Sequence, residues 1–126
     1  AGDELERDTD GWQAYAAVAP QGGEPCVGKR FNSAFRRTGL HEMLRSLGAK
    51  RLVMCGMQTE FCFDASVKAA FELGFEVTVP REAVTTFDSE FATGDALTAY
   101  FEDRIWDGRF AQVKDTASVI EELAAR

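Results

Sequence analysis

An apolar run that stops at a glycine is the feature that most constrains the fold of this chain. Leu52-Val53-Met54-Cys55 leads into Gly56, a short polar turn follows, and a segment with helical character begins at Cys62. Parallel α/β sheets place reactive groups at such junctions, between the carboxyl end of a strand and the start of a helix. Unpaired backbone N–H groups and the positive end of the helix dipole favour a thiolate there. Cys62 is therefore a candidate nucleophile.

Strand-like and helix-like segments alternate along the rest of the chain, which predicts an α/β fold with a mainly parallel sheet. Strands are expected at 26–29, 51–55, 75–79 and 110–113, and helices at 40–47, 62–73 and 95–105. A last helix is expected after Asp115 or Thr116 as its cap. The length of 126 residues and a hydrophobic content of 45% suit one packed domain over residues 1–126.

The composition excludes several classes of partner. The formal net charge is -7, and no basic stripe is present that would bind nucleic acid or an anionic membrane. No apolar run approaches the length of a membrane span, and the charged start lacks the apolar core of a signal peptide. Three cysteines without close pairing fit a reducing compartment better than a disulfide framework. We therefore expect a cytoplasmic protein.

The sequence of the central segment resembles that of a known protein family. Gly56-Met57-Gln58-Thr59-Glu60-Phe61-Cys62, followed by Ala69-Ala70 and Gly74-Phe75, is similar to the isochorismatase-like cysteine hydrolases. That superfamily includes nicotinamidases, N-carbamoylsarcosine amidases and streptothricin hydrolases, and the resemblance runs from about Asp10 to Val113. It implies a three-layer, Rossmann-like α/β/α fold with strand order 3-2-1-4-5-6. It also implies a small-molecule amide as substrate and a homo-oligomer.

The resemblance further implies which residues act. In the family an aspartate, a lysine and a cysteine cooperate, and the cysteine attacks an amide or related carbonyl. Cys62 matches the nucleophile, and Lys29 matches the lysine because Ser33-Ala34-Phe35 follows it as in the family. The backbone N–H groups of Gln58 and Cys62 would bind the oxyanion, with a cis peptide between Met57 and Gln58.

Three apolar side chains, Phe35, Met57 and Phe61, are expected to line the substrate pocket. The lysine has alternatives within the sequence. Lys29 could be an ordinary exposed lysine, and Arg30 is a neighbouring cation that could take its place. The position at the end of the expected strand, together with Phe35 downstream, favours Lys29.

No cofactor and no metal are expected. Nicotinamidases have a metal site built from several histidine and aspartate ligands. This chain has one histidine, His41, which is expected at the surface of the helix at 40–47.

The aspartate of the family has no counterpart in the sequence. Relatives carry it in an apolar first strand, usually as Asp-x-Gln, whereas Asp3, Asp8 and Asp10 lie in a polar stretch and Asp64 lies beyond Cys62. We therefore expect that the first two strands of the family are missing. The strand at 26–29 would then pair with the central strand, pair with another chain, or lie detached, and the last option is favoured.

Two functions from different classes follow. The first is a cysteine hydrolase that cleaves a carbon–nitrogen bond in a small amide. The second is a non-catalytic relative or fragment with a binding or assembly role, which the absent aspartate favours. A redox thiol protein is a distant third, because Cys55 and Cys62 lack the Cys-x-x-Cys spacing. Cys55 is instead expected to pack between sheet and helix.

Overall fold

The computed structural model describes residues 6–126, so the expectation for Asp3 lies outside the described residues. Short 3₁₀ turns at Asp10–Trp12 and Ala16–Val18 precede the first α-helix. The helices are α1 (Leu40–Ser46), α2 (Asp64–Glu72), α3 (Gly94–Tyr100) and α4 (Thr116–Ala124). The strands are β1 (Arg51–Val53), β2 (Gly56–Met57), β3 (Glu76–Pro80), β4 (Val84–Thr85) and β5 (Gln112–Lys114). Wider π-helical turns, η3 (Thr59–Phe63) and η4 (Phe101–Trp106), adjoin α2 and α3.

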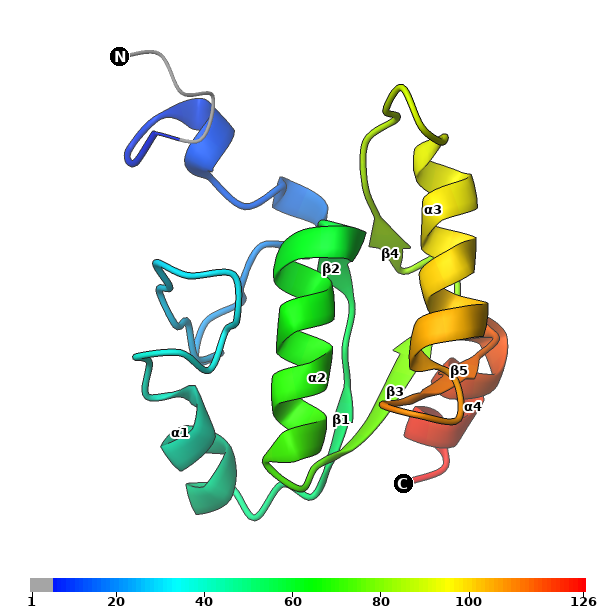
Figure 1. Ribbon diagram of the computed structural model, residues 1–126. Helices are drawn as coiled ribbons and strands as arrows, with labels where there is room; N and C mark the ends of the chain where they lie inside the picture. Colours follow the sequence, from blue (N-terminus) through cyan, green and yellow to red (C-terminus); the bar gives the residue numbers. More distant parts are fainter. Residues whose placement is uncertain (1–5) are drawn as a thin grey trace.

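The strands form two small parallel sheets (Figure 1). The main sheet has the order β1-β3-β5, with Leu52 beside Val77 and Val79 beside Val113. The second sheet pairs β2 with β4. The predicted α/β class and parallel pairing are confirmed, and the main sheet has the order expected for the last three strands of 3-2-1-4-5-6.

The core lies between the main sheet and the helices on one of its faces. Val67 and Ala70 of α2 are fully buried and belong to one cluster with Val77 and Val79 of β3. Trp106, also fully buried, packs its ring edgewise on Phe63 at a centroid distance of 5.1 Å. Burial of a valine or phenylalanine side chain contributes about 1.5–3 kcal/mol, so this cluster fixes α2 on the sheet.

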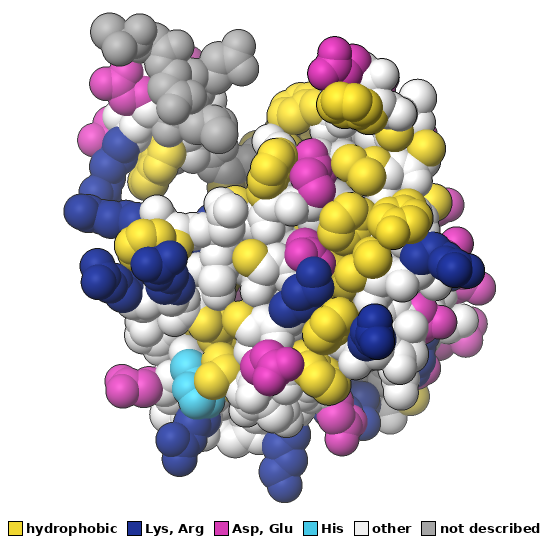
Figure 2. All heavy atoms as spheres, in the orientation of Figure 1, with side chains coloured by type: hydrophobic (Ala, Val, Ile, Leu, Met, Phe, Trp, Pro, Cys, Tyr) yellow, Lys and Arg dark blue, Asp and Glu magenta, His cyan; other side chains and the backbone are white. Residues whose placement is uncertain are grey.

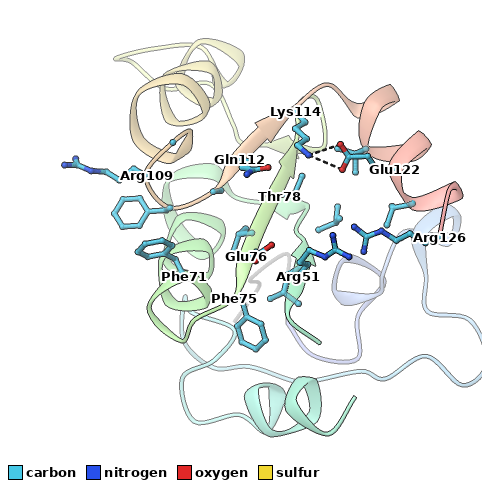
Figure 3. A pocket seen from close by; sticks show the side chains of 18 residues that line it. Arg51, Phe71, Phe75, Glu76, Thr78, Arg109, Gln112, Lys114, Glu122 and Arg126 are labelled. Atoms are coloured by element: carbon cyan, nitrogen blue, oxygen red, sulfur yellow. Dashed lines mark hydrogen bonds and ion pairs between the residues drawn. The ribbon is translucent and has the colours of Figure 1, made fainter. Parts of the chain in front are cut away.

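The opposite face of the main sheet is polar (Figure 3). Alternate residues of the strands point there, and a groove of about 550 Å³ lies between this face and α4. The Nζ of Lys114 on β5 donates to both carboxylate oxygens of Glu122 on α4, at 2.8 and 3.0 Å. Parallel sheets usually bury two apolar faces, so this polar face is a departure from the common pattern. The labelled side chains on it are Arg51, Glu76, Thr78, Gln112 and Lys114.

Three local predictions are wrong. The strand predicted at 26–29 is absent, and no strand in the described part of the chain lies beside these residues to pair with them. The segment is therefore detached from the sheet, which is the option that the sequence analysis favoured. Val84–Thr85, which lies outside the expected strands, forms β4 because Gly56–Met57 offers it a partner. Cys55 is exposed rather than packed, since β1 ends at Val53 and the alternation of the strand stops there.

Candidate functional site

The candidate thiol lies in the tight connection between β2 and α2. Gly56 has a φ of +140°, a conformation that side chains with a Cβ rarely adopt. After it, the carbonyl of Gln58 accepts the N–H groups of Phe61 and Phe63 at 3.2 and 3.1 Å. These bonds close η3 around Cys62, which is partly exposed.

Two buried side chains, one before and one after Cys62 in sequence, anchor this turn. The hydroxyls of Thr59 and Thr98 hydrogen-bond at 2.7 Å, and Thr59 is fully buried. Phe63 is buried against Trp106. Cys62 is therefore held at the surface between two buried neighbours, which limits the movement of its backbone.

Lys29 is the cation beside the thiol. Its Nζ lies 3.2 Å from the Sγ of Cys62 and also donates to the carbonyl of Phe31 at 3.0 Å. The second bond holds the side chain in a bent conformation over its own segment. Lys29, rather than Arg30, is therefore the cation that the structure brings to Cys62.

Ser66 connects the segment that follows Lys29 with the turn that carries Cys62. Its Oγ donates to the carbonyl of Cys62 at 2.7 Å and accepts the N–H of Ala34 at 2.9 Å. The sequence analysis did not single out Ser66. A serine one helical turn after a candidate nucleophile is, however, a pattern that favours a bond to the carbonyl four residues earlier.

Asn32 is a second neighbour of the thiol that the sequence analysis missed. Its Oδ1 lies 3.7 Å from the Sγ of Cys62, within the range of a weak S–H···O hydrogen bond. Its place beside the Ser33-Ala34-Phe35 segment could have pointed to it, because that segment was already tied to Lys29.

The expected pocket residues lie in two places. Met57 and Phe61 are 54% and 53% exposed and flank the turn, and the Met57–Gln58 peptide is cis, as the resemblance implied. Phe35 stacks on Phe75 at a centroid distance of 6.2 Å. Phe75 follows the C-terminal end of α2, whereas Cys62 precedes its N-terminal end, so the structure does not bring Phe35 to the thiol.

No carboxylate within residues 6–126 hydrogen-bonds to Cys62 or Lys29. Asp8 and Asp10 make no such contact, and Asp64 instead accepts from the indole N–H of Trp106 at 2.9 Å. In the same range, no group of three His, Cys, Asp or Glu side chains is arranged to hold a metal, and no helix is long and apolar enough to cross a membrane.

Comparisons with known proteins give the family of this chain. The family model described as "Isochorismatase domain" matches residues 1–118. The chain is 36% identical over 80 residues to a streptothricin hydrolase of Streptomyces noursei, covering 64% of this chain and 29% of that protein. It is 36% identical over 92 residues to a maleamate amidohydrolase of Pseudomonas putida, covering 65% and 43%.

A solved structure shows the same fold. An isochorismatase from Pseudomonas putida KT2440 superposes with a TM-score of 0.81 at 27% identity, covering 90% of this chain and 60% of that one. The chain spans less than half the length of the two curated relatives. Since the family model covers nearly the whole chain, this protein belongs to the isochorismatase family.

Proposed function

We propose that this chain carries the cysteine and lysine of a hydrolase that cleaves the carbon–nitrogen bond of a small-molecule amide. One observation carries the proposal. The ammonium of Lys29 lies 3.2 Å from the thiol of Cys62, across 33 residues of sequence. A cation at this distance favours the thiolate, which is the nucleophilic form of cysteine. The amidohydrolase and hydrolase names of the relatives support the same class of reaction.

The proposed reaction has two stages. The Cys62 thiolate attacks the amide carbonyl, the S–C bond forms, and the backbone N–H groups of Gln58 and Cys62 bind the resulting oxyanion. The C–N bond then breaks, and the amine leaves with a proton. Water attacks the thioester next, so that the S–C bond breaks, the carboxylic acid leaves and the thiol is restored. Met57 and Phe61 would flank the substrate.

The amine in the first stage departs only with a proton, and a carboxylate normally supplies it in such sites. Within residues 6–126 no carboxylate forms a hydrogen bond or an ion pair with Cys62 or Lys29. This observation favours a second candidate function, a non-catalytic member of the family with a binding or assembly role. The two candidates differ in whether the thiol forms an acyl intermediate.

An activated ester separates these candidates, because p-nitrophenolate leaves without being protonated. The chain is mixed with p-nitrophenyl acetate, and the release of p-nitrophenolate is followed while mass spectrometry maps the acetyl group. We expect a burst of one equivalent with the acetyl group on Cys62. Cys62→Ser is expected to abolish the burst, and Cys55→Ser serves as the matched control because Cys55 is also a free cysteine.

A burst that persists in Cys62→Ser, or acetyl groups spread evenly over all three cysteines, would contradict the proposal and support the non-catalytic alternative. Hydrolysis of amides is then measured separately. If Cys62 is acylated but amides are not cleaved, the nucleophile is present and the donor of the proton for the leaving amine is missing.

A further inference from the structure

A thiol and an amine lie in contact at the surface of the molecule. The Nζ of Lys29 is 3.2 Å from the Sγ of Cys62, and a second hydrogen bond, to the carbonyl of Phe31 at 3.0 Å, holds the amine there. Lys29 is exposed and Cys62 is partly exposed. Small solutes, including oxidants, therefore reach both groups.

The surroundings of Lys29 provide no carboxylate to balance its charge. Residues 25–41 contain four cations, Lys29, Arg30, Arg36 and Arg37, and no aspartate or glutamate, although the formal net charge of the chain is -7. Figure 2 shows Lys and Arg side chains gathered at the left, over the segment that leads into α1. Within residues 6–126, no carboxylate forms a hydrogen bond or an ion pair with Lys29. The thiolate of Cys62 is thus the anion in contact with this ammonium.

Oxidation of the sulfur removes that anion. When hydrogen peroxide converts the thiolate of Cys62 to a sulfenic acid, an S–O bond forms and the O–O bond breaks. The departing hydroxide takes a proton from the ammonium of Lys29 and becomes water. The neighbouring cations favour this loss of a proton, because like charges disfavour the charged form of an amine. A neutral amine is then left beside a neutral sulfenic acid.

The group placed to react with this sulfenic acid is an amine rather than a second thiol. Within residues 6–126, the side chains that hydrogen-bond to the Sγ of Cys62 are Lys29 and Asn32, and all three cysteines are free. A sulfenic acid condenses with a nearby thiol or nitrogen, and a neutral lysine amine is a nucleophile. The oxidised sulfur therefore reacts further without the second cysteine of a Cys-x-x-Cys pair.

We propose that Lys29 and Cys62 form a redox-sensitive modification site, at which hydrogen peroxide produces a reversible sulfenamide crosslink between Nζ and Sγ. After the first step described above, the amine attacks the sulfur, the S–N bond forms, the S–O bond breaks, and the hydroxyl leaves as water with a proton from the nitrogen. One peroxide is consumed, two waters form, and the pair loses two hydrogen atoms. A thiol reductant attacks the sulfur, the amine leaves with a proton, and a second thiol then releases Cys62 from the mixed disulfide.

The crosslink occupies both side chains of the candidate site at once. Cys62 is then no longer a nucleophile, and it is protected from oxidation to the irreversible sulfinic and sulfonic acids. Reduction restores the thiol and the amine together. This inference goes beyond the proposed function and does not depend on amide cleavage, because it needs only an accessible thiolate and an amine in contact.

The test is treatment of the whole chain with hydrogen peroxide, followed by digestion without reductant and mass spectrometry. We expect the peptides that carry Lys29 and Cys62 to be joined with the loss of two hydrogen atoms, and to separate again in dithiothreitol. A variant that combines Cys26→Ser and Cys55→Ser is expected to form the same crosslink, which excludes a disulfide as its source. Lys50→Met removes an exposed lysine elsewhere and is expected to leave the yield unchanged.

Lys29→Arg is the most informative variant. It keeps a positive charge beside the thiolate, but a guanidinium group stays protonated and does not attack the sulfur. We expect no crosslink in this variant. Dimedone, which traps sulfenic acids, is expected to label Cys62 at least about fivefold more than in the unaltered protein, because the sulfenic acid then has no amine to condense with.

Three results would overturn the inference: a disulfide of Cys62 with Cys26 or Cys55 as the main product, a linkage to Lys29 that retains an oxygen atom, or equal dimedone labelling of the unaltered protein and Lys29→Arg. The acylation burst with p-nitrophenyl acetate, measured on the reduced protein, tests the proposed function separately. A burst without a crosslink refutes only the inference, and a crosslink without a burst refutes only the proposed function.

Discussion

The Nζ of Lys29 lies 3.2 Å from the Sγ of Cys62, although 33 residues separate them in sequence. The two residues reach one another through α2, because Ser66 on that helix hydrogen-bonds to both segments. The same helix is fixed on the sheet by fully buried Val67 and Ala70. The contact is thus supported by the core rather than by the surface loop alone, and the predictions below test each part of that support.

Removing the ammonium of Lys29 is expected to slow the alkylation of Cys62. Lys29→Met keeps the length of the side chain and removes one charge-assisted hydrogen bond, which contributes about 1.5 kcal/mol and corresponds to roughly a tenfold change. Because Lys29 is exposed to solvent, we expect a loss of roughly fivefold at neutral pH. The measurement is the rate of iodoacetamide incorporation at Cys62, with Lys50→Met as the exposed control. Equal rates in all three proteins would show that the 3.2 Å contact has no effect on reactivity.

Removing the hydroxyl of Ser66 is expected to affect both stability and the thiol. Ser66→Ala leaves the N–H of Ala34 and the carbonyl of Cys62 without their partner, at a cost of about 1–3 kcal/mol in the free energy of unfolding. Urea denaturation measures this loss, and Ser118→Ala on the exposed surface of α4 is the control. We also expect slower alkylation of Cys62. Unchanged alkylation despite lower stability would limit Ser66 to a structural role.

Asp64 is expected to stabilise the fold through the indole of Trp106. Its Oδ1 accepts from Trp106 Nε1 at 2.9 Å, and its Oδ2 pairs with Lys68 at 2.8 Å. Asp64→Leu leaves a buried N–H unpaired, which costs about 1–3 kcal/mol. Lys68→Met removes only a partly exposed ion pair and costs less than about 1 kcal/mol. Urea denaturation followed by tryptophan fluorescence compares the two, and similar losses would contradict this assignment.

The strands and helices at 51–53, 64–72, 76–80 and 116–124 were predictable from their apolar periodicity. In 64–72 and 76–80 that periodicity also matches which residues are buried. The thiol turn was also predictable, since Gly56 marks a conformation that few other residues adopt. The pairing of β2 with β4 was not, because two-residue strands carry no periodic pattern. The contacts of Asn32 and Ser66 could not be predicted from the sequence for another reason. They join segments about 30 residues apart, and no local pattern specifies such a pairing.

Residues 26–29 show that a local preference for strand is not enough to form one. Residues 26–29 have the composition of a strand, yet a strand needs a neighbour to accept its backbone hydrogen bonds. Lys29 nonetheless reaches Cys62, because Ser66 and the bond to the Phe31 carbonyl hold the segment without a sheet. The sequence predicted both a strand at 26–29 and a contact between Lys29 and Cys62, and the structure has only the contact.

Two glutamates are expected to give opposite pH trends in stability. Burial raises the pKa of Glu102 above its ordinary value of 4.5, although Arg81 opposes the shift. The folded protein then binds this proton more tightly than the unfolded chain, so stability from Glu102 is present at low pH and is lost as pH rises from about 4.5 through the folded pKa. Glu102→Gln removes that loss, and the free energy of unfolding of the variant relative to the unaltered protein is expected to increase with pH.

Glu122 provides the matched comparison. The hydrogen bond from Lys114 lowers the pKa of its carboxyl below 4.5, so its contribution is present above that value and is lost as pH falls through the folded pKa. The stability of Glu122→Gln relative to the unaltered protein is therefore expected to decrease as pH rises. Urea denaturation at a series of pH values from about 3.5 to 8 measures both trends. Parallel trends in the two variants would contradict the assigned causes.

The order in which the three cysteines react tests the central claim most directly. Cys26 and Cys55 are exposed, whereas Cys62 is only partly exposed, so accessibility alone predicts that Cys62 reacts last. The contact with Lys29 predicts the reverse, because the thiolate and not the thiol is the nucleophile. The chain is titrated with less than one equivalent of iodoacetamide from low pH upward, and the adducts are mapped by mass spectrometry. We expect the first adduct on Cys62. A first adduct on Cys26 or Cys55 would contradict the account.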